Sequence, residues 1–353
     1  MSADGWRQLV DLDRLSGWLD ACGLEAGPIV DPMALAGGTQ NVLLRFRRGD
    51  RHFVLRRPPS HPYMDGSATM RREARVLSAL AGTDVPHPRL IRACTTDDIL
   101  GAAFYLMEPV DGFNANVGLP ELHASSSEVR HDMGIALADG LAALGRVDHL
   151  AAGLGDLGKT DGFLERQAPR WRSQLEKYAA YKGWPGEAGL PGVEEIDSWL
   201  RENRPADSQP GILHGDYHLA NVMFRRDGPE LAAIVDWELT TIGDPLVDLG
   251  WMLATWPDRS GQTLGAVGAV PWDGFPTSAE LIERYAVGSR RDLGAIRWYA
   301  VLGCYKLGIL QEGTYARAFA GKAPMAQGER LHRATVGLFE RALGWIESRN
   351  PFV

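Results

Sequence analysis

The decisive segments of this sequence are HGDYHLAN at 214–221 and IVDWE at 234–238. Asp216 and Asn221 lie five positions apart, in a segment too interrupted to be a buried helix. Asp236 comes directly after a short apolar run, where a buried strand would end. An Asp near a hydroxyl can accept its proton, and an Asn with a second Asp supplies oxygen ligands of the kind that Mg²⁺ prefers. The two segments therefore favour a site for a hydroxyl, a magnesium ion and a triphosphate.

Length and composition are those of an ordinary globular protein. The 353 residues suit two domains or lobes, and 45% of them are apolar and 23% charged. The formal net charge of −8 argues against a protein that binds nucleic acid through a basic face. The three cysteines are widely spaced, which suits a reducing cytosol and offers no zinc site. Because we find no signal peptide and no membrane-spanning apolar run, we expect a cytoplasmic protein without a membrane partner.

The first third of the chain predicts a β-rich region with one embedded helix. Apolar spacing favours a leading helix over 6–22. Two strand-like segments flank Arg48-Gly49-Asp50, which is a turn sequence typical of hairpins. The predicted elements after the leading helix are strands at 42–46 and 52–56, a helix over about 68–80, and a strand at 103–107.

Beyond Gly112 the pattern becomes mostly helical. We expect helices over about 128–147, 162–181, 193–203, 245–256, 278–287, 293–312 and 329–347, with a strand pair near 222–224 and 231–235. The segments 183–192 and 257–276 are predicted to be loops. We therefore predict an N-terminal lobe at 1–107, a hinge at 108–112, and a helical lobe at 113–353 that contains both decisive segments.

The polar residues of the decisive segments also have purely structural interpretations. Asp216 and Asn221 are residue types that form Asx-turns, and Asp236 could cap a turn or a helix. Glu238 could reach a second metal ion or simply face solvent. The nearness of Asp236 to the first segment favours the metal-binding interpretation.

A different class of enzyme is suggested by the two histidines beside Asp216. His214 and His218 form a His-x-Asp-x-His spacing that a metallohydrolase could use. The remaining histidines are scattered along the chain, so the sequence offers no matching cluster. His214 is better interpreted as a structural residue of the loop.

Two features of the N-terminal lobe could bind phosphate. Gly37-Gly38-Thr39-Gln40-Asn41 precedes the first hairpin strand, and its backbone N–H groups could cradle an anion, although most Gly-Gly pairs are simply turns. Arg56 ends the second hairpin strand and Glu73 lies in the next helix, so a carboxylate could fix a cation that holds the α- and β-phosphates. The alternative is a surface ion pair worth less than about 1 kcal/mol, and neighbouring arginines compete for the role.

The segment Asp244-Pro245-Leu246-Val247-Asp248 has the features of a helix start. Asp244 would be the N-cap and Pro245 would lie in the first turn. Asp248 would lie one turn into the helix, from where it could accept hydrogen bonds from the backbone of residues 214–216. We expect Asp248 and His214 to support that loop without touching the reactants.

Taken together, these residues resemble the aminoglycoside phosphotransferase family of protein-kinase-like small-molecule kinases. The family pattern His-x-Asp-x-x-x-x-Asn is matched by His214, Asp216 and Asn221, and its metal-binding Asp by Asp236. The resemblance extends to the Gly-Gly-x-x-Asn loop, to the Glu of the lobe helix and to the Asp-Pro-x-x-Asp segment. The ordered set spans nearly the whole chain.

The segment Met107-Glu108-Pro109-Val110-Asp111-Gly112 is similar to the hinge of protein kinases. The resemblance implies that the backbone of Glu108 and Val110 meets the adenine of ATP and that Met107 lines the adenine pocket. In the family, the Gly-Gly-x-x-Asn pattern lies in the nucleotide-binding loop. The resemblance therefore also implies that Gly37, Gly38, Thr39 and Asn41 belong to that loop.

Within this family, three short segments are similar to the kinase-like domain fused to some acyl-CoA dehydrogenases. The similar segments are FVLRRPP at 53–59, VDWEL at 235–239 and GILQEG at 308–313. Those relatives are associated with phosphorylating hydroxylated fatty acids or their CoA esters. Two positions depart from the pattern, because Arg56 replaces the usual Lys and Gly145 replaces a His that many relatives carry.

The resemblance implies an α+β, protein-kinase-like two-lobed fold with ATP and Mg²⁺ bound at the cleft between the lobes. Asp216 would be the base, Asn221 and Asp236 would hold the metal, and Arg56 with Glu73 would hold phosphate. The expected function is transfer of the γ-phosphate to a hydroxyl of a small molecule, such as a hydroxy acid or hydroxyacyl-CoA. An aminoglycoside or amino alcohol remains an alternative acceptor. A catalytically silent nucleotide-binding scaffold remains the alternative from another class, and no obligate protein partner is evident.

Overall fold

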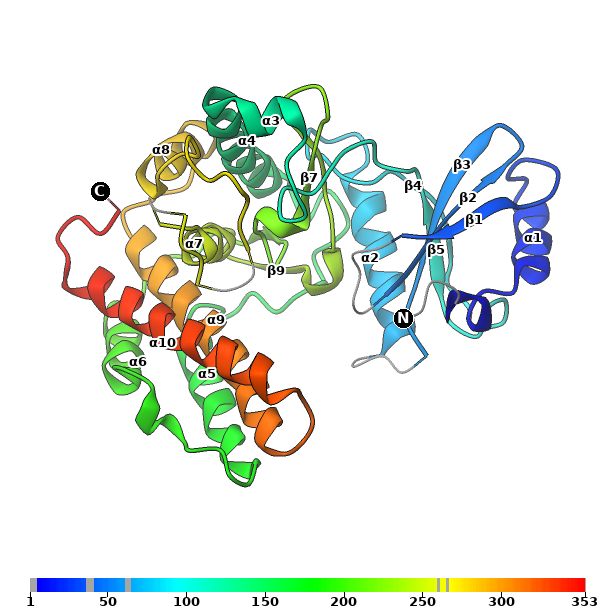
Figure 1. Cartoon of the computed structure of the whole chain (residues 1–353). Coiled ribbons are helices and arrows are strands. Elements are labelled where there is room, and N and C mark those ends of the chain that lie inside the picture. Colours follow the sequence, from blue (N-terminus) through cyan, green and yellow to red (C-terminus); the bar gives the residue numbers. More distant parts are fainter. Residues whose placement is uncertain (1–4, 36–40, 61–64, 259–260, 265–266, 353) are drawn as a thin grey trace. The chain divides into compact units, whose positions relative to one another are not determined.

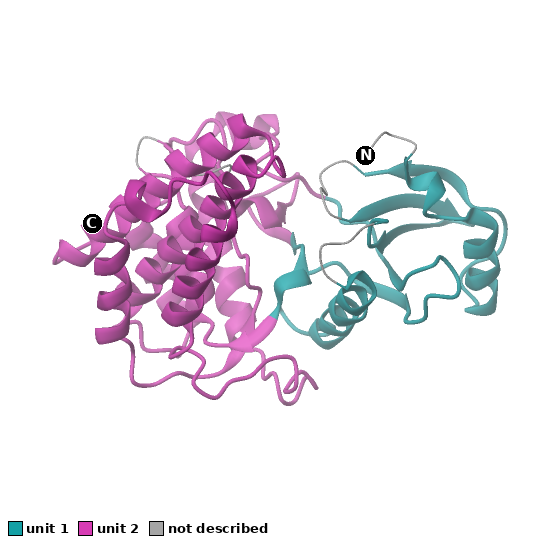
Figure 2. Cartoon of the chain, turned by 90° about the horizontal axis from the view of Figure 1, so that it is seen from below, with its two compact units in different colours: residues 1–111, 233–240 teal, residues 112–232, 241–353 magenta. Residues whose placement is uncertain are grey.

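The computed structural model of the chain describes residues 5–35, 41–60, 65–258, 261–264 and 267–352 (Figure 1). The chain divides into two compact units (Figure 2). Unit 1 comprises residues 1–111 and 233–240, and unit 2 comprises residues 112–232 and 241–353. The segment 233–240, which contains Asp236, therefore groups with the β-rich part of the chain, whereas our division from sequence assigned it to the helical part.

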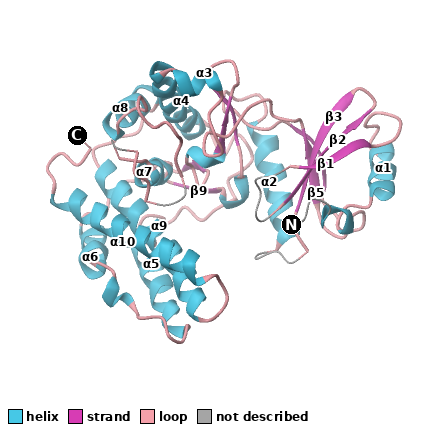
Figure 3. Ribbon diagram, viewed as in Figure 1, coloured by secondary structure: helices cyan, strands magenta, loops and turns pink. Residues whose placement is uncertain are grey.

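Unit 1 is built on a five-stranded antiparallel sheet with strand order β1-β2-β3-β5-β4 (Figure 3). The predicted hairpin is present, and Gly49 supplies the positive φ of +54° that its tight turn requires. Residues along β2 alternate between buried and more exposed positions, because one face of the strand covers the core. The strands are β1 Val30–Ala34, β2 Val42–Arg48, β3 Arg51–Arg57, β4 Leu90–Cys94 and β5 Phe104–Met107.

Helices cover this sheet and complete the core of unit 1. The side chain of Asp65 caps α2 by accepting a hydrogen bond from the backbone N–H of Ala68, and the helix then buries Val76, Leu77 and Leu80. Helix α2 packs on β3, β4 and β5 and on the short helix η5. Residues of α1 join a hydrophobic cluster with β2 and β3. The helices are η1 Gly5–Gln8, α1 Leu12–Ala21, α2 Gly66–Leu80 and η5 Trp237–Leu239.

Unit 2 is mostly helical, with two small strand pairs, β6–β9 and β7–β8. Strand β8 ends inside unit 1. The helices are α3 Glu121–Ser125, α4 Ser127–Arg146, α5 Gln167–Glu176, η2 Lys177–Ala180, η3 Glu187–Gly189, α6 Val193–Glu202, η4 Leu219–Asn221, α7 Leu246–Thr255, α8 Ser278–Gly288, α9 Ile296–Phe319 and α10 Met325–Glu347. The strands are β6 Gly211–Leu213, β7 Val222–Phe224, β8 Leu231–Ile234 and β9 Thr241–Gly243.

Helix α7 forms the centre of unit 2 and packs closely on α9. All ten of its residues are buried, which explains why its sequence is apolar on every face. The backbones touch where Gly250 of α7 meets α9, because a Cβ at Gly250 would lie 2.1 Å from the carbonyl oxygen of Tyr299. Gly303 of α9 makes the reciprocal approach to the carbonyl of Gly250. The two glycines thus fix how these helices lie against each other.

The element boundaries differ from the sequence prediction in specific places. Helix α9 continues to Phe319, past the predicted end near 312, because Gly313 fits against the ring of Tyr178 without interrupting the helix. The predicted helix over 162–181 is shorter, since α5 begins only at Gln167. Strands β6 and β9 contain three residues each, which is too short for an alternating pattern to reveal them.

No helix among the described residues combines the length and the apolar character that crossing a membrane requires.

The contact between α7 and α9 predicts the effect of one added methyl group. We expect Gly250→Ala to lower the free energy of unfolding by about 1–3 kcal/mol, because the new Cβ overlaps the backbone of Tyr299. A Cβ at Gly344 in α10 would meet no atom within 4 Å, so Gly344→Ala should raise the stability by roughly 0.5–1 kcal/mol. Thermal and urea denaturation of the two variants measures both changes, and equal stability of the two would contradict the close approach.

Candidate functional site

The loop 214–221 follows β6 and is held by a buried carboxylate of α7. Asp248 accepts hydrogen bonds from the backbone N–H of His214 at 2.6 Å and of Gly215 at 3.0 Å. Asp248 is buried, and burial raises the pKa of its carboxyl group, while His214, these two N–H groups and Lys306 oppose that rise. Because both oxygens accept backbone N–H groups, the path of the loop is fixed at its first two residues.

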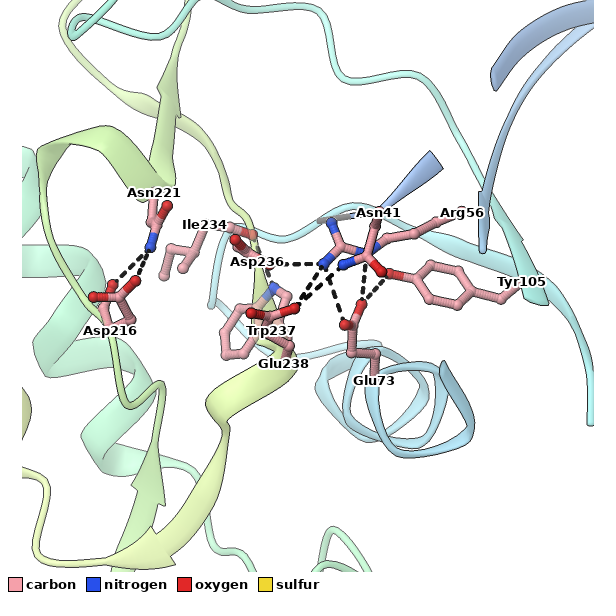
Figure 4. Close-up of polar contacts among 10 residues, drawn as sticks. All are labelled: Asn41, Arg56, Glu73, Tyr105, Asp216, Asn221, Ile234, Asp236, Trp237 and Glu238. Carbon is pink, nitrogen blue, oxygen red and sulfur yellow. Dashed lines mark hydrogen bonds and ion pairs between the residues drawn. The ribbon is translucent and has the colours of Figure 1, made fainter. Parts of the chain in front are cut away.

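The side chain of Asp216 is held at both of its oxygens. Asn221 donates from Nδ2 to Oδ2 of Asp216 at 2.8 Å and to its backbone carbonyl at 2.9 Å (Figure 4). Oδ1 accepts from the indole Nε1 of Trp251 at 3.0 Å and lies 3.2 Å from Nε2 of His218. Burial alone would raise the pKa of the Asp216 carboxyl, but His218, with contributions from His214 and Lys306, holds it well below its usual range. Asp216 therefore carries a negative charge in a fixed orientation.

A lysine from α9 completes the surroundings of the loop. Lys306 donates from Nζ to the carbonyl of Gly215 at 3.1 Å. Its ammonium also lies 4.2 Å from the centroid of the Trp251 ring, within the range of a cation–π interaction. Burial lowers the pKa of Lys306, while Asp248 and Asp216 oppose that change. Gly215 is thus bound at its N–H by α7 and at its carbonyl by α9.

A pocket in unit 2 opens beside Asp216. Its walls combine apolar side chains with three uncharged polar or imidazole side chains. The lining residues are Asp216, His218, Trp251, Thr255, Leu264, Val267, Leu307 and Gln311. Asp216 is the only carboxylate among these described residues, and neither Lys nor Arg is among them. The pocket can therefore accept an uncharged group next to a carboxylate.

A second polar cluster lies within unit 1 and is centred on Arg56. The guanidinium lies 2.9 Å from the carboxylate of Glu73 and 2.7 Å from that of Asp236 (Figure 4). Glu238 lies 3.9 Å from the same guanidinium and accepts a hydrogen bond from Asn41 at 3.2 Å. The hydroxyl of Tyr105 donates to Glu73 at 2.7 Å. One cation thus joins strand β3, helix α2 and the segment after β8.

The charges of this cluster support one another in a buried setting. Arg56 and Glu73 are both buried. Burial alone would lower the pKa of Arg56, but Glu73, Tyr105 and Asp236 raise it above its usual value. Burial raises the pKa of Glu73, while Arg56 and the Tyr105 hydroxyl act in the opposite direction. Each buried charge therefore has a partner, as burial of a charge requires.

The backbone presents Asp236 in an uncommon conformation. Asp236 has φ +67° and ψ +62°, in the left-handed region that few residues other than glycine adopt. Trp237 is buried, and its indole N–H donates to the carbonyl of Ile234 at 2.9 Å, which ties the turn to the end of β8. Strained conformations of this kind persist where the surroundings fix them, and they are common at functional sites.

The oxygen atoms of unit 1 suit a hard divalent cation. Carboxylate oxygens of Glu73, Asp236 and Glu238 lie within 4.8 Å of one another. Among the residues that the structure describes, no other three Asp, Glu, His or Cys side chains bring their possible ligand atoms this close together. Carboxylate oxygens are ligands that Mg²⁺ prefers. His214, Asp216 and His218 do not form such a group, which disfavours the metallohydrolase interpretation.

The comparisons with known proteins identify the family of the chain. The model of the phosphotransferase enzyme family matches residues 33–299, which is most of the chain. The chain belongs to this family. The match includes the loop 214–221, the Arg56 cluster and Asp248.

The relatives of this family member include a much longer protein and a protein of about the same length as this chain. Acyl-CoA dehydrogenase family member 10 of Mus musculus is 29% identical over 310 residues, which are 86% of this chain and 28% of that protein. The chain therefore spans less than a third of that relative's length. A crystal structure from Ralstonia eutropha JMP134, provisionally assigned as an aminoglycoside phosphotransferase, is 27% identical with a TM-score of 0.78, covering 95% of this chain and 97% of its own.

A solved structure of much lower sequence identity has a similar fold. Choline kinase from Cryptosporidium parvum Iowa II shares 12% identity with a TM-score of 0.63, and 96% of each chain is covered. At this identity the likeness concerns the fold alone. The predicted α+β, protein-kinase-like fold is confirmed by these neighbours.

The remaining predicted site residues are placed as follows. Gly37, Gly38 and Thr39 lie outside the described residues. Met107 ends β5, where it pairs with β3 and β4. The backbone N–H of Glu108 donates to the carbonyl of Arg89 at 2.9 Å, and its carboxylate contacts Arg51 at 3.1 Å. Val110 follows in the segment that ends unit 1, so the roles of these hinge residues stay predictions.

Sequence reasoning missed three residues that contact the predicted site. Trp251 and Lys306 hold Asp216 and Gly215, and Tyr105 holds Glu73. Trp251 had a usable signal, because it lies three residues after Asp248 and so shares a face of the predicted helix. Lys306 and Tyr105 had none, since their contacts depend on how separate elements pack.

The two hydrogen bonds that Asp248 accepts predict a loss of stability when its carboxylate is replaced by an amide. We expect Asp248→Asn to lower the free energy of unfolding by about 1–3 kcal/mol, because an amide NH₂ would replace one oxygen and leave a buried backbone N–H unpaired. Amide hydrogen exchange at His214 and Gly215 should become faster. Glu195→Gln on the exposed face of α6 is the control and should leave both measurements unchanged. Unaltered exchange at the loop in Asp248→Asn would show that the carboxylate does not hold it.

Proposed function

We propose that this chain transfers the γ-phosphate of ATP to a hydroxyl group of a small molecule. The observation that carries the proposal is the arrangement of Asp216, whose ionised carboxylate is held by Asn221 and Trp251 at the edge of a pocket. Phosphoryl transfer requires positioning and charge stabilisation and little covalent chemistry from the protein. Membership of the phosphotransferase family supports the reaction class.

Asp216 is proposed to bind the acceptor hydroxyl and to accept its proton. The pocket beside it offers space for the carbon skeleton that carries the hydroxyl. A carboxylate of low pKa is a weak base, so its main contribution is to orient the hydroxyl and to stabilise the proton as it leaves in the transition state. His214 and Asp248 support the loop and do not contact the reactants in this proposal.

Asn221 and Asp236 are proposed to hold Mg²⁺. The amide N–H groups of Asn221 both donate to Asp216, so its amide oxygen is the atom that would bind the metal. Asp236 belongs to the acidic group of unit 1 that suits a hard cation. When bound, Mg²⁺ would neutralise charge on the phosphates. Glu238, which lies in the same acidic group, is a further ligand candidate.

Unit 1 is proposed to bind the nucleotide. Arg56, fixed by Glu73, would hold the phosphates, and arginine suits this role because its guanidinium binds phosphate in a bidentate manner. Gly37, Gly38, Thr39 and Asn41 would form the loop over the phosphates. The backbone of Glu108 and Val110 would bind adenine, with Met107 in its pocket. The hinge and the glycine loop rest on the family resemblance.

The pocket of unit 2 favours an acceptor whose reacting end is uncharged. An aminoglycoside carries several ammonium groups, and burying them would require carboxylates that this pocket does not offer beyond Asp216. A quaternary ammonium such as choline is bound by cages of Trp, Tyr or Phe rings, and Trp251 is the single ring of these types among the described lining residues. A hydroxy acid or hydroxyacyl-CoA whose hydroxyl lies on an aliphatic chain fits Leu264, Val267 and Leu307 better.

The proposed reaction predicts that Asp216→Asn abolishes transfer. We expect turnover to fall by about 10³-fold or more, because the variant can neither orient the hydroxyl as a carboxylate does nor accept its proton. The affinity for ATP should remain largely intact, since Asp216 is not assigned to nucleotide binding. Phosphate-transfer assays and a thermal-shift titration with ATP measure the two quantities.

The same titration separates an enzyme from a silent scaffold. ATP should raise the melting temperature of the wild type more in the presence of Mg²⁺ than in its absence, and Asp236→Asn should remove the Mg²⁺-dependent part. No Mg²⁺-dependent shift in the wild type would favour the scaffold. Full turnover by Asp216→Asn would rule out the proposed role of this residue.

The acceptor proposal predicts an order of activity among hydroxyl compounds. In a screen of hydroxy acids, hydroxyacyl-CoAs, aminoglycosides and amino alcohols, we expect the highest kcat/KM for compounds whose hydroxyl lies on an uncharged aliphatic chain. Leu307→Asp, which adds a carboxylate to the pocket wall, should lower kcat/KM for these compounds by about tenfold or more. Highest activity toward a polycationic aminoglycoside would contradict the assignment.

A further inference from the structure

We propose that Trp251 is a positioning residue that determines which oxygen of Asp216 receives the acceptor hydroxyl, and that Lys306 holds Trp251 in place. The inference rests on the proposed function, because it assumes that Asp216 binds the hydroxyl. It concerns two residues that the sequence patterns left without a role. Both lie in unit 2, on helices α7 and α9.

The hydrogen bonds of Asp216 leave its two oxygens unequal. A carboxylate has about four lone-pair sites, two on each oxygen. Oδ1 meets both the indole N–H of Trp251 at 3.0 Å and Nε2 of His218 at 3.2 Å, so its two sites are occupied. From the residues that the structure describes, Oδ2 accepts one hydrogen bond, donated by Asn221 at 2.8 Å. Oδ2 therefore has the remaining capacity to accept a hydrogen bond from an incoming hydroxyl.

Trp251 is well suited to fix this choice. An indole N–H only donates, so Trp251 cannot compete with Asp216 for the proton of the hydroxyl. The ring is buried in a helix that has no exposed residue, which limits its motion. Trp251 also follows Asp248 by three residues, so one face of α7 holds both the backbone of the loop and the carboxylate of Asp216.

Lys306 connects the ring to the same loop. Its ammonium lies 4.2 Å from the centroid of the Trp251 ring, and its Nζ donates to the carbonyl of Gly215 at 3.1 Å. The residue before Asp216 and the indole that binds Asp216 are therefore held by one cation. Movement of the ring would weaken the cation–π contact, so Lys306 restrains the direction of the indole N–H.

Loss of the indole N–H should affect catalysis more than nucleotide binding. Without it, Oδ1 has an open site, and the hydroxyl can then bind at either oxygen. Only one of these arrangements has the geometry for transfer, so the productive fraction falls. Misplacement of a reacting group by about 1 Å can reduce a rate by roughly 100-fold. Trp251 has no assigned contact with the nucleotide, so the KM for ATP should stay unchanged.

The kinetic test uses Trp251→Phe in the full chain, with water as the acceptor and Mg²⁺·ATP as the donor. We expect kcat to fall about 10-fold to 100-fold, with an unchanged KM for ATP. Trp298→Phe is the matched control, because Trp298 is also a buried indole of unit 2 and donates to the carbonyl of Leu200 at 2.8 Å. It should lower stability without lowering kcat. Equal kcat values for the wild type and Trp251→Phe would overturn the inference.

A second variant pair tests Lys306. Lys306→Met should lower kcat as Trp251→Phe does, and Lys306→Arg should restore part of the loss because it keeps a cation beside the ring. A role limited to stability would change the melting temperature in both variants and leave kcat per folded molecule unaltered. Identical kcat in Lys306→Met and the wild type would remove Lys306 from the proposal.

An NMR measurement tests the hydrogen bond independently of any activity. In protein labelled with ¹⁵N-tryptophan, the indole N–H signal of Trp251 is the one that Trp251→Phe removes. A hydrogen bond to a carboxylate shifts such a proton downfield, so Asp216→Asn should move this signal upfield while the signal of Trp298 stays in place. An unmoved Trp251 signal would refute the inference. A moved signal in a protein without any phosphate transfer would leave the contact established and reject the proposed function instead.

Discussion

The site in unit 2 depends on one buried carboxylate that accepts two successive backbone N–H groups. Asp248 is 1% exposed, so an unpaired charge there would be strongly unfavourable. The hydrogen bonds from His214 and Gly215 satisfy it and, in the same contact, fix the backbone that precedes Asp216. The direction of Asp216 then follows from the path of the chain. The pairing of a buried charge and the direction of Asp216 therefore rest on the same two hydrogen bonds.

The packing of α7 against α9 carries this arrangement further. Gly250 and Gly303 let the two helices approach to backbone contact. The same two helices provide Asp248 and Trp251 from one side and Lys306 from the other, and all three contact the loop 214–221. Hydrogen bonds from two packed helices restrain the loop, and a restrained loop holds its side chains in place. The glycines thus influence the site although they do not touch it.

The sequence predicted those parts of the site whose residues are close in the chain or carry a strong pattern. The hairpin with Arg56, the helix with Glu73 and the contact of Asp248 with the loop backbone follow from turn residues, apolar spacing and a short motif. Lys306 reaches the loop from 91 residues away, and Tyr105 contacts Glu73 of α2 from a sheet that the sequence outlined only in part. Leu264 and Val267 come from a segment predicted only as a loop, yet they line the pocket. Such contacts depend on tertiary packing, which periodicity does not encode.

The cluster around Arg56 fixes the positions of the acidic side chains of unit 1 in the absence of a ligand. A guanidinium already lies between the carboxylates of Glu73 and Asp236, with Glu238 nearby. Arg56 therefore acts as a counter-ion that reduces the repulsion among the three carboxylates. If a divalent ion binds here, as proposed, it would meet carboxylates whose positions are already set, and little free energy would be spent on ordering them. Such an ion would also compete with the guanidinium for Asp236, so its affinity would reflect the balance of these two effects.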